Sequence, residues 1–288
     1  MMTRRFTVYV GALITLVLTG FFVWITPLWP SLFANQSGLL QVSFLSVGQG
    51  DAIFIETPDG VQVLIDGGPS GEVLSQLAGQ MPFFDTRLDV VIGTHPDLDH
   101  VAGLVNVLSR YRVDTIVTTE ATGASPAAKA WAEAVVAEGA VVQYARAGQV
   151  LQLGASTTLT ILSPTFDPSP LDSNTGSIIV LLEYGEIGFM LTGDAPQGIE
   201  TYLVDTHGAA LEAEVLKLGH HGSDTSSASS FLAAVNPLFA VVSAGVNNRY
   251  NHPHPDVLAR VADTDALVVS TQDGSVHFYT DGQVLWVE

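Results

Sequence analysis

Short apolar runs separated by turn residues fill the chain from residue 39 onward. Short runs rich in Val, Ile and Leu predict buried strands, and longer segments with apolar residues at helical spacing predict helices. We expect strands over residues 40–45, 52–56, 61–65, 88–93, 113–119, 140–144, 150–153, 157–162, 177–183, 187–191, 214–218, 238–243, 266–270, 275–279 and 284–287. We expect helices from about residue 70, over 101–108, over 125–138, from Pro196, over 226–235 and through residue 258. Because strands and helices alternate throughout, this region is predicted to form one α/β domain.

The first 38 residues follow a different pattern. After Arg4 and Arg5, no charged residue occurs from Phe6 to Trp29, and a helix needs about 20 apolar residues to cross a bilayer. Arginines before the apolar run predict an N-in, C-out orientation. We therefore expect residues 1–38 to be an uncleaved transmembrane anchor with a short linker, and residues 39–288 to lie outside the cytoplasm. The alternative is a signal peptide whose cleavage releases a secreted protein.

Composition limits the chemistry of the chain. The formal net charge is -19 with only 10 Lys and Arg, so the surface should repel nucleic-acid phosphate at long range. A metal site could still neutralise one phosphodiester locally. The absence of cysteine excludes disulfides, thiolate nucleophiles and Cys-ligated zinc. Any metal must therefore be held by His, carboxylate or amide groups.

The most concentrated chemistry lies directly after the predicted strand at residues 88–93. His95, Asp97, Asp99 and His100 place two imidazoles and two carboxylates within six residues of a strand-to-helix turn. Charges packed this closely repel one another without a cation, so the cluster indicates a site for one or two divalent metals. The alternative is a polar turn in which Asp99 or His100 caps the next helix.

Six of the eight histidines lie at the ends of predicted strands. Two are in the central cluster, His220 and His221 follow the strand at 214–218, and His252 and His254 are in the loop after 238–243. This concentration indicates a shared function. His207 and His277 stand alone, and we interpret them as structural or surface residues.

Carboxylates also follow predicted strands. Asp66 and Asp194 each come directly after a buried strand, where a carboxylate can orient or bind a metal ligand. Asp66 has the alternative role of capping the helix that follows it. Asp51 ends the glycine-rich turn at residues 47–51, whose amides could approach an anion or simply form a tight bend.

Together these segments resemble the metallo-β-lactamase superfamily. The closer resemblance is to its ComEC-like branch, the extracytoplasmic C-terminal domain of the competence DNA-uptake channel. The segments that carry it are residues 44–52, 64–68, 94–100, 191–194, 216–223 and 252–255, spread over most of the chain after the anchor. The resemblance implies a four-layer αββα sandwich with a two-metal site along one edge of the sheets.

The resemblance also implies roles for individual residues. His95 and Asp97 would bind the first metal, Asp99 and His100 the second, and Asp194 would bridge both. The second site would be completed from four later histidines, which the sequence does not rank: His221, His220, His252 and His254. Residues that would support the ligands or the substrate are Asp51, Asp66, Asn174 and Ser223.

Two positions depart from the superfamily pattern. Asp97 stands where a second histidine is usual, and Asn174 where a further histidine ligand is expected. Both replace nitrogen with oxygen, which favours Mn²⁺ or Mg²⁺ relative to Zn²⁺. They also weaken the first site, so two divalent ions are expected while a one-metal or inactive site stays open.

The chemistry that such a site supports is hydrolysis. Two cations lower the pKa of a water and stabilise charge on an attacked phosphoryl group. Asp99 would orient the water, and Lys217 or a loop histidine would neutralise or protonate the leaving oxygen, unless Lys217 is a strand-end lysine that reaches solvent. The hypothesis is a membrane-anchored phosphodiesterase that cleaves single- or double-stranded DNA beside a DNA-uptake channel. The alternatives are a hydrolase of a small ester, lactone or β-lactam, and a non-catalytic metal-binding domain.

Overall fold

Two β-sheets form the centre of the protein in a computed structural model that describes residues 38–288. The strands of the first sheet are β1 (Leu40–Phe44), β2 (Ile53–Glu56), β3 (Gln62–Ile65), β4 (Arg87–Gly93), β5 (Arg112–Thr118), β6 (Val141–Tyr144), β14 (Val276–Thr280) and β15 (Leu285–Val287). Their order is β15-β14-β1-β2-β3-β4-β5-β6. The second sheet contains β7 (Val150–Leu153), β8 (Thr157–Ser163), β9 (Ile179–Tyr184), β10 (Ile187–Leu191), β11 (Val215–Lys217), β12 (Phe239–Val242) and β13 (Leu267–Ser270). Their order is β13-β12-β11-β10-β9-β8-β7.

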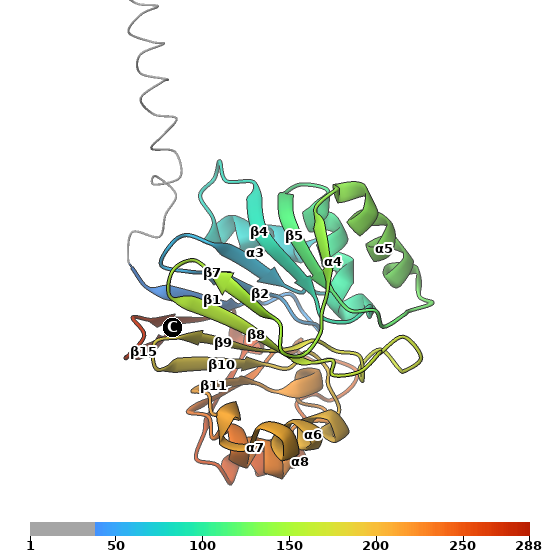
Figure 1. Ribbon diagram of the computed structural model, residues 1–288. Helices are drawn as coiled ribbons and strands as arrows, with labels where there is room; N and C mark the ends of the chain where they lie inside the picture. The colour runs from blue at the N-terminus through green and yellow to red at the C-terminus, as the bar shows by residue number, and fades with distance from the viewer. Residues whose placement is uncertain (1–37) are drawn as a thin grey trace, which may run out of the picture. The chain divides into compact units, whose positions relative to one another are not determined.

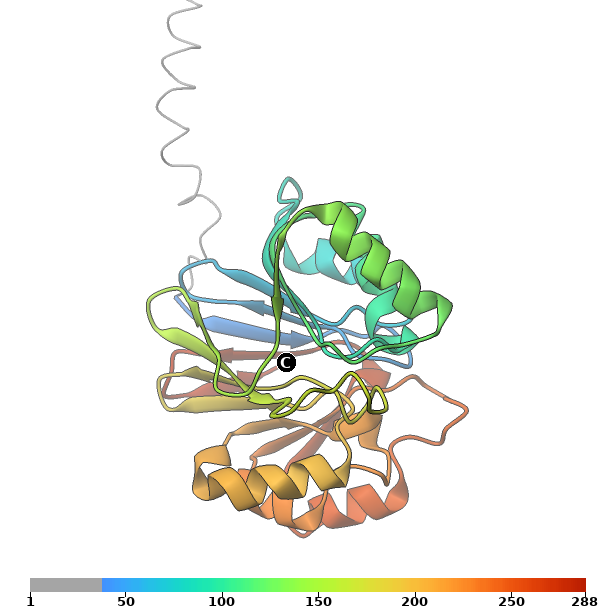
Figure 2. The same ribbon diagram turned by 45° about the vertical axis from the view of Figure 1, so that its right-hand side comes forward.

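Helices cover the outer face of each sheet (Figures 1 and 2). Those on the first sheet are α3 (Glu72–Gln80), α4 (Leu98–Leu108) and α5 (Pro126–Glu138). Those on the second sheet are α6 (Gln197–His207), α7 (Ser229–Val235) and α8 (Pro255–Ala262). Short 3-10 segments are η1 (Gly208–Leu211), η2 (Gly219–Gly222) and η3 (Thr271–Asp273). The predicted four-layer αββα sandwich is therefore confirmed.

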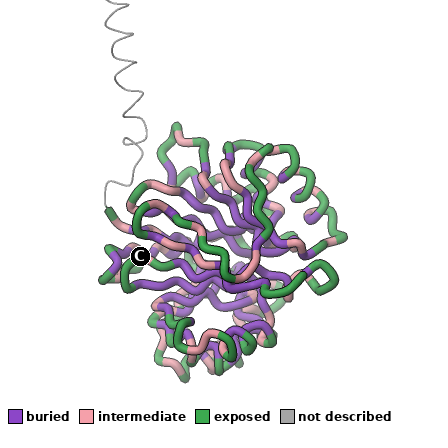
Figure 3. Tube along the Cα trace, in the orientation of Figure 1, coloured by how far each residue is buried: buried purple, intermediate pink, exposed green. Residues whose placement is uncertain are grey.

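Three hydrophobic clusters hold the layers together. Successive residues of a strand point to opposite faces, so Ile55 of β2 packs between the two sheets while Phe54 packs against α3, α4 and α5. On β11, Val215 likewise faces the other sheet and Leu216 faces α6, α7 and α8. Figure 3 shows the buried residues running along the strands of both sheets. Because strands of both sheets are covered on both faces, they read as continuous apolar runs in the sequence.

Strand direction divides the sandwich into two edges. β3, β4 and β5 are parallel to one another, and so are β10, β11 and β12. β1 runs in the same direction as β3, because β2 is antiparallel to both. We call the edge where these strands end the carboxyl edge, and the edge where they begin the amino edge. The loops at the carboxyl edge carry the predicted site residues.

The expected strands are all present, but some helix starts differ. The helix expected over 101–108 begins at Leu98, so Asp99 and His100 lie in its first turn. Asp97 is the N-cap residue and its side chain makes no capping bond, so capping by Asp99 or His100 is wrong. The helix expected from residue 226 begins at Ser229, because Ser227 has a positive φ of 58° that a helix cannot accommodate.

The expected membrane anchor at residues 6–29 lies outside the described residues. Within residues 38–288, no helix has both the length and the apolar character that a membrane span requires.

Candidate metal centre

Histidine and aspartate side chains converge at the carboxyl edge. Asp66 follows β3, the central cluster follows β4, and Asp194 follows β10. His220 and His221 lie in η2 directly after β11, and His252 lies in the loop after β12. Since these five loops from two sheets lie at one edge, residues far apart in the chain become neighbours.

One oxygen of Asp194 is the centre of the cluster. Its Oδ2 atom lies 3.2 Å from Nε2 of His100 and 3.4 Å from Nε2 of His221. Nε2 of His220 is 3.7 Å away and Nε2 of His95 is 3.9 Å away. Four imidazole nitrogens therefore surround a single buried carboxylate oxygen.

The opposite nitrogen of all four imidazoles is already bonded, and that of His220 lies 3.0 Å from the hydroxyl of Thr225. Nδ1 of His95 is 3.1 Å from the hydroxyl of Thr94, and Nδ1 of His100 is 2.8 Å from Oδ2 of Asp66. Nδ1 of His221 donates to the carbonyl oxygen of Ser243 at 2.9 Å. Such bonds fix the tautomer in which Nδ1 carries the proton, so the lone pair of Nε2 points into the cluster.

These free nitrogens provide a test of whether the cluster fits a metal. Nε2 of His95, His100 and His221 and Oδ1 of Asp194 are buried and have no hydrogen-bond partner in the described part of the chain. A neutral imidazole that presents a lone pair to a carboxylate is repelled unless a metal ion lies between them or the nitrogen itself takes up a proton. The donor set, imidazole and carboxylate, is one that divalent metals prefer. The cluster therefore fits divalent metal ions.

Asp97 and Asp99 extend the cluster in two directions. Oδ2 of Asp97 is 3.8 Å from Nε2 of His95, and Oδ2 of Asp99 is 3.4 Å from Nε2 of His221. Each aspartate thus lies beside a different histidine, with Asp194 between the two groups. The assignment of the two aspartates to different metals stays a prediction, and the histidine beside Asp99 is His221, whereas the expected pairing was with His100.

Asp51 lies behind the imidazoles. The tightest group of candidate ligands combines Asp51 with His100, Asp194 and His221. However, Asp51 approaches the Nδ1 side of His100 and His221, at 3.8 and 3.3 Å, whereas Asp194 faces their Nε2 atoms. One ion cannot contact both nitrogens of one ring, so this geometry favours Asp51 as a residue that orients the histidines.

Lys217 does not reach solvent. Its side chain is fully buried, and Nζ lies 2.5 Å from Oδ2 of Asp51 and 3.7 Å from Oδ1 of Asp194. Nζ also donates to the carbonyl oxygen of Gly193 at 2.8 Å. The alternative of a solvent-reaching lysine is therefore wrong. Held in this way, the ammonium is placed to balance charge and position the two carboxylates, and less well placed to protonate a leaving group.

The charges in the cluster shift the pKa values of the histidines in opposite directions. Burial and the neighbouring His100 lower the pKa of His95 to about 3. Burial also acts to lower the pKa of His100 and His221, but Asp194 and a second aspartate outweigh it, raising the pKa of His221 to about 9 and that of His100 well above its usual value. A metal must displace these protons, so metal affinity should increase with pH.

The backbone at two ligand candidates is strained. His220 and His221 have φ values of 51° and 57°, a left-handed conformation that side chains with a Cβ rarely adopt. Two such residues in succession cost about 1–3 kcal/mol each. They place both imidazoles beside Asp194, and strain of this kind concentrates at functional sites.

Three predicted site residues lie apart from the cluster contacts. His254 is the N-cap of α8, where its Nδ1 accepts a hydrogen bond from the amide of Asp256. The hydroxyl of Ser223 is 3.0 Å from that of Thr225. Asn174 has a buried Oδ1 without a hydrogen-bond partner in the described residues. The structure thus separates His252 from His254 but does not bring Asn174 or Ser223 into contact with the aspartates.

A cavity of about 150 Å³ opens over the cluster. Its lining comprises Gln49, Asp97, Asp99, Asp194, His220, His221, Tyr250 and His252. Sequence reasoning did not identify Gln49, Tyr250 or the supporting residue Thr94. Only Thr94 had a usable signal, its position directly before His95.

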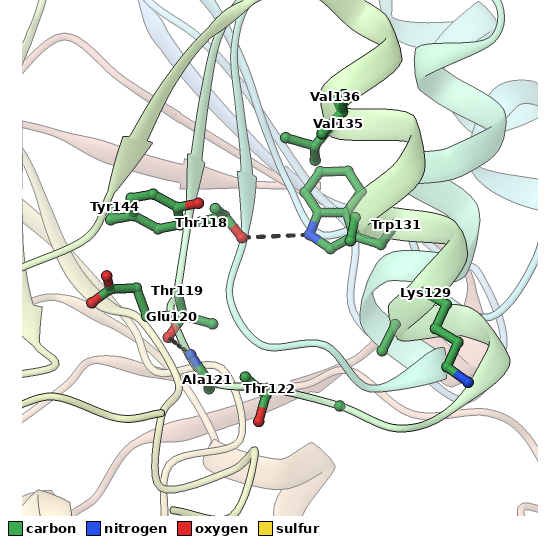
Figure 4. Close-up of a pocket in the computed structure, with 13 residues that line it drawn as sticks. Thr118, Thr119, Glu120, Ala121, Thr122, Lys129, Trp131, Val135, Val136 and Tyr144 are labelled. Atoms are coloured by element: carbon green, nitrogen blue, oxygen red, sulfur yellow. Dashed lines mark hydrogen bonds between the residues drawn. The ribbon is translucent and has the colours of Figure 1, made fainter. Parts of the chain in front are cut away.

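A larger cavity of about 480 Å³ lies beside β5, β6 and α5 (Figure 4). Its wall adjoins the central motif, because Gly123 packs against Pro96. Its buried polar groups are paired, with Nε1 of Trp131 donating to the hydroxyl of Thr118 at 3.4 Å. Within the described chain it offers no converging ligands, so the chemistry belongs to the smaller cavity.

The fold and the site define the class of the protein. Residues 45–246 match the metallo-beta-lactamase superfamily, and the chain belongs to this superfamily. The metallo-beta-lactamase fold protein YhfI from Bacillus subtilis superposes with a TM-score of 0.55 at 14% identity, covering 85% of this chain and 99% of that one. Members of this fold bind divalent metals, typically zinc or iron.

Within the superfamily, the chain is similar to competence proteins. It is 30% identical over 256 residues to ComE operon protein 3 of Bacillus subtilis, covering 83% of this chain and 33% of that protein. It is 30% identical over 249 residues to recombination protein 2 of Haemophilus influenzae, covering 84% and 29%. The chain therefore spans about a third of the length of these relatives. The predicted ComEC-like resemblance is confirmed.

Proposed function

We propose that the protein is a divalent-metal-dependent phosphodiesterase whose substrate is single- or double-stranded DNA. The observation that carries the proposal is the buried set of unpaired imidazole nitrogens around the Asp194 carboxylate, with Asp97 and Asp99 beside it. The competence and recombination names of the relatives support a substrate related to DNA. Oxygen-rich ligands favour Mn²⁺ or Mg²⁺, and the histidines also suit Zn²⁺.

The cavity can take a phosphate group only together with bound metal ions. Three aspartates line it, so an anionic phosphodiester would be repelled unless bound cations neutralised them. At the rim, the guanidinium of Arg249 lies 4.8 Å from the ring centre of the exposed Tyr250. This pair offers a positive charge and an aromatic face, which together suit a phosphate and a neighbouring base.

Individual side chains would divide the work of hydrolysis. Bound divalent ions would supply Lewis-acid activation of a water and neutralise charge on the phosphoryl group. Asp99 faces the cavity beside His221, where its carboxylate can orient the attacking water. His252 also lines the cavity, and its Nδ1 is buried without a partner in the described residues. We assign proton donation to the leaving oxygen to His252, because the ammonium of Lys217 is engaged by Asp51.

We further propose that residues 1–38 anchor the enzyme in the membrane, N-in and C-out, with the hydrolase domain at residues 39–288 outside the cytoplasm. The support is the uncharged run from Phe6 to Trp29 after two arginines. An enzyme so placed could act beside a DNA-uptake channel.

The test is hydrolysis of labelled single- and double-stranded DNA by the purified protein with Mn²⁺, Mg²⁺ or Zn²⁺. Asp194→Asn keeps the shape of the side chain while removing the charge at the centre of the cluster. His254→Ala is the matched control, since His254 is close in sequence to His252 but caps a helix. We expect cleavage with at least one metal, loss of cleavage in Asp194→Asn, and no loss in His254→Ala.

Other outcomes would contradict the proposal. Absence of cleavage with every metal, in protein shown to be folded, would rule out the nuclease. Turnover of a lactone, a small ester or a chromogenic β-lactam in the same samples would then identify a small-substrate hydrolase, which the charge of -19 accommodates readily. Metal binding without turnover of any substrate would indicate a non-catalytic domain.

A further inference from the structure

Two adjacent phenylalanines are exposed in the loop between α3 and β4. The relative exposure of Phe83 is 89% and that of Phe84 is 79%. Their rings contact each other edge to face, with centres 5.0 Å apart, and neither belongs to a hydrophobic core cluster. Exposing aromatic rings to water is unfavourable. Two adjacent exposed rings therefore indicate a surface that docks onto a partner or a membrane.

This loop lies at the amino edge, away from the metal centre. It leads into β4, and β1, which begins at Leu40, runs in the same direction as β4. The described chain therefore begins at the same edge as Phe83 and Phe84. In Figure 1 the loop forms the cyan tip above the start of β4, and Figure 3 shows it as exposed.

Three arginines lie at the same edge of the sheet as the two rings. Arg87 begins β4, Arg112 begins the adjacent β5, and Arg110 lies in the turn before β5. The amide of Arg112 donates to the carbonyl oxygen of Thr86, which ties this turn to the loop. Arg110 and Arg112 are exposed and take part in no salt bridge among the described residues. In a chain with only 10 Lys and Arg, this local group of cations is conspicuous.

The neighbouring carboxylate does not cancel these charges at the tip. Asp85 is only partly exposed, and it accepts hydrogen bonds from the side chain of Gln62 and the amide of Arg87. Arg87 itself is paired with Asp114. Arg112 also acts on Asp114, so the tip presents two rings near two exposed guanidinium groups, of which that of Arg110 has no ion-pair partner among the described residues.

The length of the segment before Gly38 limits how far this surface can lie from the membrane. Eight residues lie between Trp29, the end of the uncharged run, and Gly38, and even a fully extended segment of that length spans only about 30 Å. If the proposed anchor crosses the membrane, the amino edge is held within that distance of the bilayer. Aromatic rings and arginines are the side chains that settle at a bilayer interface.

We propose that the Phe83–Phe84 loop docks into the interface of the bilayer that carries the anchor. The rings would lie among the lipid headgroups, and Arg110 and Arg112 would contact lipid phosphates. The metal centre would then face away from the membrane. A symmetric contact with a second copy fits less well, because it would bring the arginines of both copies together. The inference rests on the proposed anchor and is independent of the proposed hydrolysis.

The test measures the depth of the loop in the membrane. Because the chain has no cysteine, Phe84→Cys gives a single site for a nitroxide label in the full-length protein. The protein is reconstituted in vesicles of phosphatidylcholine and phosphatidylglycerol, and the collision of the label with oxygen is compared with its collision with a water-soluble nickel complex. Val246→Cys is the matched control, since Val246 is 64% exposed but follows β12 at the carboxyl edge.

We expect the oxygen-to-nickel ratio at position 84 to be several-fold higher than at position 246, and Phe83→Ser to lower the ratio at position 84. A water-exposed label at position 84, in protein that floats with the vesicles, would overturn the docking and leave the anchor intact. Protein that does not float with the vesicles would overturn both. Dipolar broadening of the label's spectrum, which requires a second label nearby, would instead identify a contact between copies and overturn the lipid assignment.

Discussion

Asp66→Asn should weaken metal binding at His100, because the substitution changes which ring nitrogen of His100 carries the proton. Asp66 accepts three hydrogen bonds, from the amide and hydroxyl of Thr94 at 2.8 and 2.7 Å and from Nδ1 of His100 at 2.8 Å. An asparagine keeps one acceptor oxygen and places an NH₂ group at the other position. The hydroxyl of Thr94 can rotate to accept from that group, but an Nδ1–H of His100 cannot.

His100 would therefore move its proton to Nε2. That nitrogen is the atom that faces Asp194 at 3.2 Å, and a protonated Nε2 cannot bind a metal. Loss of a carboxylate that orients a metal-binding histidine typically lowers affinity about 10- to 100-fold. The fold itself should lose only about 1–3 kcal/mol, the cost of one buried unpaired group.

The assay is metal binding by competition with a chelator, together with nitrogen NMR of the histidine rings. Asp256→Asn is the matched control, because Asp256 lies 3.7 Å from Nδ1 of His254 outside the cluster. We expect weaker binding and a changed tautomer of His100 in Asp66→Asn only. Wild-type affinity in Asp66→Asn with His100 still protonated at Nδ1 would refute the reasoning.

Three further perturbations should have distinct outcomes. Lys217→Met leaves Asp51 buried without its cation and should cost about 3–5 kcal/mol of unfolding free energy in urea titrations with chelator present. Gly103→Ala places a Cβ within 1.8 Å of the carbonyl oxygen of Gly67, so α4 must shift, and stability should fall by about 3 kcal/mol or more in the same assay. Burial raises the pKa of Glu200 from 4.5 to about 7, so the folded protein binds the extra proton and stability should decline by about 3 kcal/mol as pH rises through this range. Urea titrations at pH 5 and 8 should show that Glu200→Gln lacks this decline, and an unchanged decline would exclude Glu200 as its source.

The strands and the central motif were predictable because their signals are local. β4 ends in the apolar run Val90–Ile92 and Gly93, and His95 follows two residues later, so the position of this residue at a strand end needed no tertiary knowledge. The same reasoning placed Asp194 after β10. Once both sheets were expected, parallel strands required their carboxyl ends to meet at one edge.

The burial of Lys217 could have been predicted from the sequence. Lys217 lies two residues after Val215, so both side chains point to the same face of β11, and Val215 packs between the sheets. A strand that is covered on both faces has no solvent side for a lysine. What the sequence does not reveal is the partner, because Asp51 precedes a strand of the other sheet.

Among the four later histidines, some features were predictable from the sequence and others were not. His254 precedes Pro255, and proline at the first helical position marks the preceding residue as an N-cap, so its separation from the cluster was foreseeable. The left-handed backbone of His220 and His221 was not, because neither residue favours that conformation. It is imposed by the surroundings, in which the amide of His220 donates to the carbonyl oxygen of Gly193 and His221 is bonded to Ser243.

Charge balance at the carboxyl edge connects the site to the number of ions proposed for it. The carboxylates gathered there are Asp51, Asp66, Asp97, Asp99 and Asp194, and the permanent cation among them is Lys217. With neutral imidazoles, five carboxylates against one ammonium leave an excess of four negative charges, which two divalent ions would balance. One ion would leave two charges uncompensated in a largely buried cluster, where protonated histidines would have to supply the difference. A single-metal form should therefore retain protons on the histidines that a two-metal form releases. Metal titrations in buffers of different ionisation enthalpy measure the number of protons released per metal bound, and this number distinguishes the two forms.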